Sequence, residues 1–85
     1  MKRFFILQQD KQAPDESSVQ AHRDHLESLR TEGILLYSGS FVDYKGNMQI
    51  IQAADKKAAL VIALSDPYIR EGFKTFKMYE FTGEE

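Results

Sequence analysis

The chain has 85 residues and a mass of 9.8 kDa, which is enough for one domain, residues 1–85, and too little for two. It contains no cysteine, which excludes a disulfide scaffold, an iron–sulfur cluster, a thiolate zinc site and a cysteine nucleophile. The 11 basic and 13 acidic residues give a net charge of −2 and are intermixed, which argues against a nucleic acid or a membrane surface as partner. The longest apolar run, residues 58–64, is far shorter than the ~20 residues of a membrane span. Because small secreted domains usually need disulfides, we expect a cytoplasmic protein.

The first half of the chain predicts a strand, a helix and a second strand. Residues 3–9 contain four consecutive apolar residues, which is typical of a strand covered on both faces. A helical pattern follows over residues 17–32, where Ser17 can cap the start and Gly33 can end the helix in a left-handed conformation. Residues 34–39 are again mostly apolar and predict the second strand.

The second half predicts a strand, a helix, a short turn of helix and a final strand. Residues 48–53 form the third strand, and Asp55 caps a helix over residues 56–64. Asp66 precedes a proline, a combination typical of a helix N-cap followed by the first helical residue. Residues 73–81 alternate as a strand with aromatic side chains on both faces.

The order of elements, β-α-β-β-α-β, defines an α+β fold of the ferredoxin-like kind, a four-stranded antiparallel sheet with both helices on one face. The other face is then bare, yet the last strand carries Phe76 and Met78 on one side and Tyr79 and Phe81 on the other. An apolar bare face needs a cover, and the simplest cover is a second copy related by a two-fold axis. We therefore predict a homodimer through the open sheet face, with Phe76 and Met78 as the positions that test it.

Two histidines, His22 and His25, lie three residues apart and share one face of the first helix. His22 falls in the centre of the apolar stripe formed by Val19, Leu26 and Leu29, and His25 falls at its edge. We therefore expect His22 to be buried, neutral and hydrogen-bonded, and His25 to be reachable from a pocket. The same spacing also fits a structural histidine beside a surface one, and it predicts no metal site.

Other residues that could carry chemistry have ordinary structural roles as well. Asp66 can cap the short helix with one carboxylate oxygen and orient a histidine with the other. The run Ser38, Gly39, Ser40 offers two hydroxyls and an approachable backbone, although a simple turn would also use it. The sequence has no glycine-rich phosphate loop and no nucleophile elbow, and we predict no cofactor.

An ordered set of short motifs runs through most of the chain. The motifs are Gln9-Asp10 at the end of the first strand, His25-Leu26-x-x-Leu29, Glu32-Gly33-x-Leu35-Leu36-x-Ser38-Gly39, and Ser65-Asp66-Pro67-Tyr68 with Gly72 four residues on. In this order, and with an aromatic-rich last strand, they resemble the YciI-like family of small dimeric α+β barrel proteins.

The resemblance implies a ferredoxin-like protomer paired into a barrel, with one pocket per subunit. In that pocket a histidine of the first helix meets the aspartate before proline, which implies His25 and Asp66 as catalytic residues. Many relatives carry an arginine where this chain has His22, and the segment 40–47 lacks the Gly-Pro start common among them. We assign His22 and the run 38–40 (Ser38, Gly39, Ser40) to substrate binding.

The predicted function follows from the chemistry of such a pair. A carboxylate beside an imidazole fixes its tautomer and stabilises the imidazolium, so His25 can act as a general acid or base on a small organic molecule. Elimination, isomerisation and hydrolysis all fit. The alternative is a non-catalytic dimeric protein that binds a small metabolite, for instance in a stress response. We expect loss of His25 to abolish activity and loss of His22 to lower stability.

Overall fold

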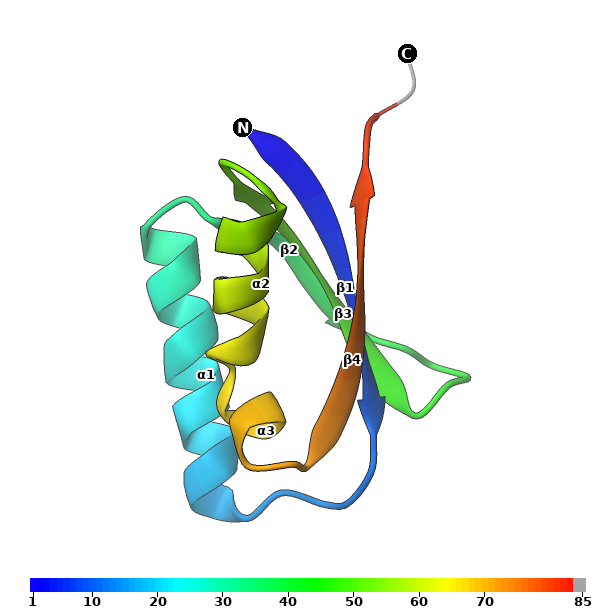
Figure 1. The fold of residues 1–85 in the computed structure, drawn as a ribbon. Helices are drawn as coiled ribbons and strands as arrows, with labels where there is room; N and C mark the ends of the chain where they lie inside the picture. Colours follow the sequence, from blue (N-terminus) through cyan, green and yellow to red (C-terminus); the bar gives the residue numbers. More distant parts are fainter. Residues whose placement is uncertain (84–85) are drawn as a thin grey trace.

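The structure is a computed structural model that describes residues 1–83. The order of its strands and long helices is the predicted one, and the turn of helix at Asp66 is also present (Figure 1). The elements are β1 (Lys2–Asp10), α1 (Glu16–Thr31), β2 (Leu35–Ser40), β3 (Gly46–Ala53), α2 (Lys56–Leu64), α3 (Pro67–Arg70) and β4 (Lys74–Phe81).

The ends of the helices are set by local capping. Asp15, and not Ser17, caps α1, because its carboxylate accepts the backbone N–H of Ser18 at 2.8 Å and the Ser17 hydroxyl donates to that same carboxylate. A carboxylate is favoured at a helix N-terminus, so the prediction of a serine cap was wrong by two residues. Gly33, at φ 76°, ends α1, and Asp55 caps α2, both as predicted.

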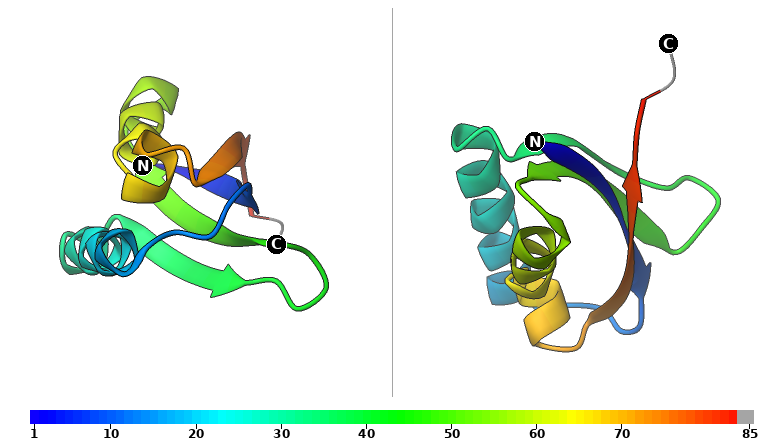
Figure 2. Two further views of the ribbon diagram at one scale, coloured as in Figure 1. Left: turned by 90° about the horizontal axis from the view of Figure 1, so that it is seen from below. Right: turned by 45° about the horizontal axis from the view of Figure 1, so that its top comes forward.

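The four strands form one antiparallel sheet in the order β2-β3-β1-β4. All helices lie on one side of the sheet, and the loop between β2 and β3 projects beyond its edge (Figures 1 and 2). This arrangement confirms the ferredoxin-like α+β fold. Within residues 1–83 no helix is long and apolar enough to span a membrane.

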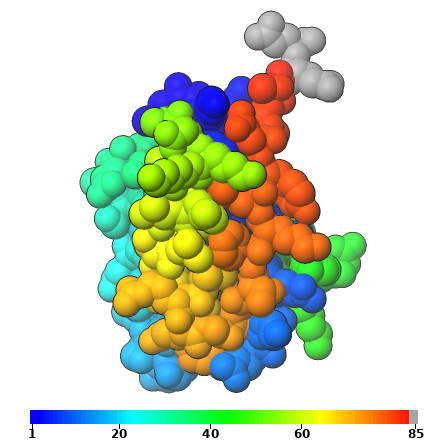
Figure 3. Space-filling model, viewed as in Figure 1, coloured from blue at the N-terminus to red at the C-terminus, as the bar shows by residue number. Residues whose placement is uncertain are grey.

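The helix-facing side of the sheet is apolar at one end and polar at the other. Its apolar half contains Phe4, Ile6 and Ile51, which are completely buried against α1 and α2. In the space-filling view α2 and α3 lie next to β4 (Figure 3). Burial of three large side chains at about 1.5–3 kcal/mol each makes this half the main source of stability.

The polar half of this face lies directly beside the apolar half on the two central strands, β1 and β3. In β1 the inward residue after Ile6 is Gln8, and in β3 the inward residues before Ile51 are Gln49 and Asn47. The antiparallel register pairs Ile6 with Gln49 and Gln8 with Asn47, so the polar positions of the two strands become neighbours. All three amide side chains are buried, so they need hydrogen-bond partners in the space beneath α1 and α3.

The open side of the sheet is rich in apolar side chains. Phe5 pairs with Ile50 on one side and with Tyr79 on the other, and Leu7 lies two positions further along β1. Tyr37 and Tyr79 are 61% and 54% exposed in the protomer. This surface is the one for which we predict a second copy.

Phe76 and Met78 do not belong to this open face. The register places Phe76 beside Gln8 and Met78 beside Ile6, on the helix-facing side, where both pack against the core. Because side chains alternate along a strand, the positions chosen from sequence to test the interface lie on the wrong side of β4.

Candidate active site

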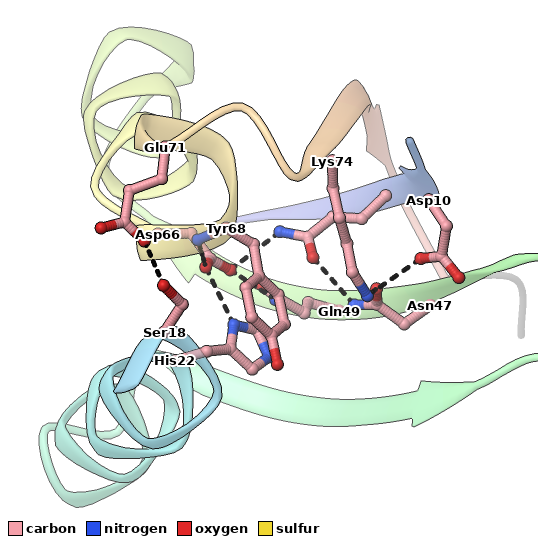
Figure 4. A network of polar contacts seen from close by, with 10 residues as sticks. Asp10, Ser18, His22, Asn47, Gln49, Asp66, Tyr68, Glu71 and Lys74 are labelled. Carbon is pink, nitrogen blue, oxygen red and sulfur yellow. Dashed lines mark hydrogen bonds and ion pairs between the residues drawn. The ribbon is translucent and has the colours of Figure 1, made fainter. Parts of the chain in front are cut away.

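The short connection between α2 and α3 places Asp66 beneath the helices, where it is 1% exposed. Its carboxylate oxygen Oδ1 accepts the backbone N–H of Tyr68 at 3.0 Å, which confirms the predicted role as N-cap of α3. The same oxygen also faces the imidazole of His22 on α1 (Figure 4). Asp66 is thus both a cap and the centre of a polar cluster.

The imidazole that meets Asp66 is that of His22, whose Nδ1 lies 2.8 Å from Oδ1. The predicted partner was His25, and the structure corrects this contact. His22 lies at the centre of the buried face of α1 and is 8% exposed, whereas His25 is rotated about 60° around the helix and is half-buried. The Nε2 atom of His25 is buried and has no hydrogen-bond partner within residues 1–83. Burial lowers the pKa of His25, although the charge of Asp66 opposes this shift.

The second carboxylate oxygen of Asp66 accepts two side-chain amides. Gln8 Nε2 lies at 2.8 Å and Gln49 Nε2 at 3.2 Å from Oδ2. Burial by itself would raise the pKa of Asp66, but the hydrogen bonds from His22 and Gln8, the charge of His22 and the backbone N–H of Tyr68 together lower it to about 2. Asp66 is therefore an anion with four hydrogen-bond donors directed at it.

A chain of amides connects Asp66 to a lysine on the last strand. Asn47 Nδ2 donates to Gln8 Oε1 at 3.0 Å, and Lys74 Nζ donates to Asn47 Oδ1 at 2.7 Å. Lys74 also pairs with Asp10 at 3.1 Å (Figure 4). Residues of β1, β3, β4 and α3 are thus joined in one polar cluster.

Tyr68 covers this cluster. Its ring stacks on His22 with centroids 4.0 Å apart and an angle of 13° between the planes, and the ammonium of Lys74 lies 4.7 Å from its centroid. Burial and the negative charges of Asp66 and Asp10 raise the pKa of Tyr68. Its hydroxyl is therefore protonated at neutral pH and can donate a hydrogen bond.

A cavity of about 210 Å³ lies beside the stacked rings. It is lined by His22, Leu26, Ser38, Gly39, Ser40, Asn47, Met48, Tyr68 and Lys74. The four residues predicted to bind substrate, His22 and the run 38–40, thus come together at one cavity, and their role as ligands stays a prediction. His25 does not line it, and Asp66 lies behind His22.

Five polar or aromatic residues of this site were given no functional role from sequence: Gln8, Asn47, Gln49, Tyr68 and Lys74. Gln8 and Gln49 do carry a signal, because an amide at an inward position of a predicted strand is unusual in a core. Such residues mark the polar half of a sheet face, although their mutual contacts depend on strand register. Within residues 1–83, no three His, Cys, Asp or Glu side chains form a group that could hold a metal ion.

The low pKa of Asp66 predicts a specific loss of stability in acid. Because the folded-state pKa of about 2 lies below the ordinary value of 3.8, the carboxylate stabilises the fold above about pH 4, and this contribution is lost as the pH falls towards 2. It amounts to about 2 kcal/mol of the free energy of unfolding at pH 7. Urea unfolding of wild-type protein and Asp66→Asn between pH 7 and pH 2 should give a weaker pH dependence for the variant. Asp43→Asn, in the exposed β2–β3 loop, should keep the wild-type dependence; an unchanged slope for Asp66→Asn would contradict the assignment.

The fold and the site together define a small ferredoxin-like α+β domain with a buried histidine–aspartate pair beside a cavity. The chain belongs to the YCII-related domain family, whose model matches residues 2–82. This finding confirms the family indicated by the sequence motifs.

A solved structure has the same fold. It is 5-chloro-2-hydroxyhydroquinone dehydrochlorinase (TftG) from Burkholderia phenoliruptrix AC1100, in complex with 2,5-dihydroxybenzoquinone. It aligns with a TM-score of 0.78 over 96% of this chain and 95% of that chain, at 18% sequence identity. A comparison with curated protein sequences gave no match.

Proposed function

We propose that this protein is a small-molecule enzyme that uses no cofactor and in which His22, oriented by Asp66, transfers protons in the adjoining cavity. The observation that carries the proposal is the 2.8 Å hydrogen bond between Asp66 and His22 Nδ1 at the wall of that cavity. Perturbed carboxylates that contact a histidine in a cleft are typical of acid–base sites. The proposal keeps Asp66 in the role predicted from sequence and gives His22 the role predicted for His25.

The tautomer of His22 follows from its partner. When Nδ1–H donates to the carboxylate, Nε2 on the other edge of the ring carries the lone pair and is the basic atom. A proton taken up at Nε2 produces an imidazolium whose charge Asp66 stabilises. Tyr68, stacked on the same ring, has a protonated hydroxyl at the cavity and can donate to an oxygen of the substrate.

Elimination is the reaction that we favour for this site. His22 removes a proton from the substrate, the electrons of that bond form a new double bond, and the leaving group departs with its electron pair as an anion. General-base catalysis of such a step contributes typically 10²–10⁴ in rate. Membership of the YCII-related family and a fold shared with a dehydrochlorinase support this choice over isomerisation or hydrolysis.

The direct test uses 5-chloro-2-hydroxyhydroquinone as the probe. We expect purified protein to release chloride from it with saturation kinetics, measured with a chloride electrode under exclusion of oxygen, and 2,5-dihydroxybenzoquinone to inhibit competitively. Binding of the quinone at the cavity without chloride release would instead support the non-catalytic alternative, a module that holds a small metabolite. Absence of both would contradict a ligand site of this class.

We also propose that two protomers pair through the open sheet face. The apolar residues Phe5, Leu7 and Ile50 lie on this face beside two tyrosines that are more than half exposed, and an apolar surface of this kind is a typical homodimer interface.

We also propose a cytoplasmic location, because a small domain without cysteine suits a reducing compartment.

A further inference from the structure

The cavity beside His22 carries a permanent positive charge and no negative one. Lys74 is the permanent cation among its lining residues, and none of the lining residues is an aspartate or glutamate. Two carboxylates contact lining residues from outside the cavity: Asp66 lies behind His22 and is surrounded by donors, and Asp10 pairs with Lys74 at 3.1 Å. The electrostatic character of the cavity wall is therefore set by Lys74.

The ammonium of Lys74 is held in place before any ligand arrives. Its side chain is 14% exposed, and Nζ donates to Asn47 and pairs with Asp10, with the Tyr68 ring beneath it. A lysine ammonium has three N–H donors. One is directed at Asn47 and a second can face the Asp10 carboxylate, and apart from the Tyr68 ring the third has no acceptor within residues 1–83. Because this long side chain is already ordered in the folded protein, binding a ligand carries little further entropy cost for it.

The amide chain fixes the direction of these hydrogen bonds. From Lys74 each group donates to the next, through Asn47 and Gln8, until the last N–H reaches the Asp66 carboxylate. Reversing either amide would place a donor against the ammonium or an acceptor against the carboxylate, so the two charges at the ends determine the orientation of both. Asn47 therefore presents its oxygen to Lys74 and keeps Nζ at the cavity wall.

The surroundings of Lys74 add further positive charge. On its other side a second hollow is lined by Lys11, Lys45 and Lys74, with Asp10 as the acidic residue. Asp10 is 44% exposed and does not line the cavity beside His22. A concentration of one sign of charge around a concave site favours ligands of the opposite sign.

We propose that Lys74 makes the cavity selective for anions, by binding a carboxylate or an ionised enol or phenol oxygen of the ligand through the third N–H of Nζ. This inference rests on the proposed function, in which the cavity is the ligand site, and adds that the ligand is an anion. Lys74 is then a specificity-determining residue, and His22, which lines the same cavity, faces the same bound molecule.

Benzoate and benzamide form a matched pair of probes, because they have the same shape and differ in charge. Each is titrated into wild-type protein, and binding is followed by the backbone amide NMR shifts of Ser38, Ser40 and Asn47. We expect benzoate to bind at least about tenfold more tightly than benzamide, since hydrogen bonds to charged groups contribute more than neutral ones. Lys74→Gln should weaken benzoate binding far more than benzamide binding and so remove this preference, while Lys74→Arg should largely restore it.

Lys57→Gln is the control, because it removes the same charge from an exposed position on α2. It should keep the preference for benzoate. Equal binding of both probes by wild-type protein, a preference that survives Lys74→Gln, or no benzoate-dependent shift at the cavity overturns the inference. The assay needs no turnover, so anion binding without chloride release would refute the proposed chemistry and leave the role of Lys74 standing.

Discussion

Replacing His22 by glutamine is expected to lower kcat/KM for chloride release about 10²–10⁴-fold, the usual contribution of a general base. Glutamine can still donate an N–H to Asp66 but has no basic atom, so the variant separates proton transfer from the structural role of the side chain. If the glutamine fails to make this hydrogen bond, the variant loses about 1–3 kcal/mol of stability, so circular dichroism with urea unfolding would check that it is folded under assay conditions.

His25→Gln is the matched control, because it makes the same change three residues further along α1, at a side chain that does not line the cavity. We expect this variant to keep at least half of the wild-type kcat/KM. Added imidazole should partly restore the activity of His22→Ala, since it supplies a base to the space left by the ring. A severe loss in His25→Gln, with activity retained in His22→Gln, would return the catalytic role to His25 and refute our assignment.

The order of elements was accessible from sequence because each signal is local. The period of the apolar residues and the capping aspartates determine where α2 begins and ends, and both ends lie where they were predicted. The start of α1 was less clear, because Asp15, Ser17 and Ser18 are all good capping residues within one turn. Only the contacts of the Asp15 carboxylate decide among them.

The partner of Asp66 depends on contacts between distant parts of the chain. His22 and His25 share a helix face, so the sequence restricts the partner of Asp66 to these two histidines. The position of α1 over the sheet determines which of them makes the contact. That position is set by packing of Leu29 in the core and by a hydrogen bond of 2.5 Å from the Ser18 hydroxyl to Glu71, at the end of α3. Periodicity predicts that Leu29 faces the core, but the contact between Ser18 and Glu71 cannot be derived from it, because it joins residues 53 positions apart in sequence.

The amide network could not be predicted from sequence, because it too depends on contacts between distant parts of the chain. Gln8 and Gln49 are visible in the sequence as polar residues within predicted strands, whereas Asn47 lies just before the predicted third strand, which begins two residues earlier in the structure. Their use as donors to one carboxylate appears only when the register places β1 beside β3 and the α2–α3 connection brings Asp66 over both. A buried polar side chain on a central strand is therefore a better pointer to this site than the histidine spacing.

Introducing a lysine in the middle of the open sheet face is expected to convert the proposed dimer into a monomer. Ile50 lies on a central strand, opposite Phe5 on one side and Tyr37 on the other, so it would face the partner near the two-fold axis. In a two-fold interface each substitution occurs twice, and an unpaired buried charge costs several kcal/mol. Ile50→Lys should therefore weaken dimerisation by at least about 10³-fold. Because Ile50 is partly exposed in the protomer, the monomer should stay folded.

Sedimentation equilibrium at micromolar concentration would measure this effect. Wild-type protein should have a mass near twice 9.8 kDa, and Ile50→Lys a mass near 9.8 kDa with an unchanged circular dichroism spectrum. Val61→Lys places the same charge on an apolar residue of α2 that is 61% exposed, and it should remain dimeric because it lies on the helical side of the molecule. A monomeric wild type would refute the dimer, and a dimeric Ile50→Lys would move the interface away from the open face. If Val61→Lys alone dissociates, the helices and not the sheet form the interface.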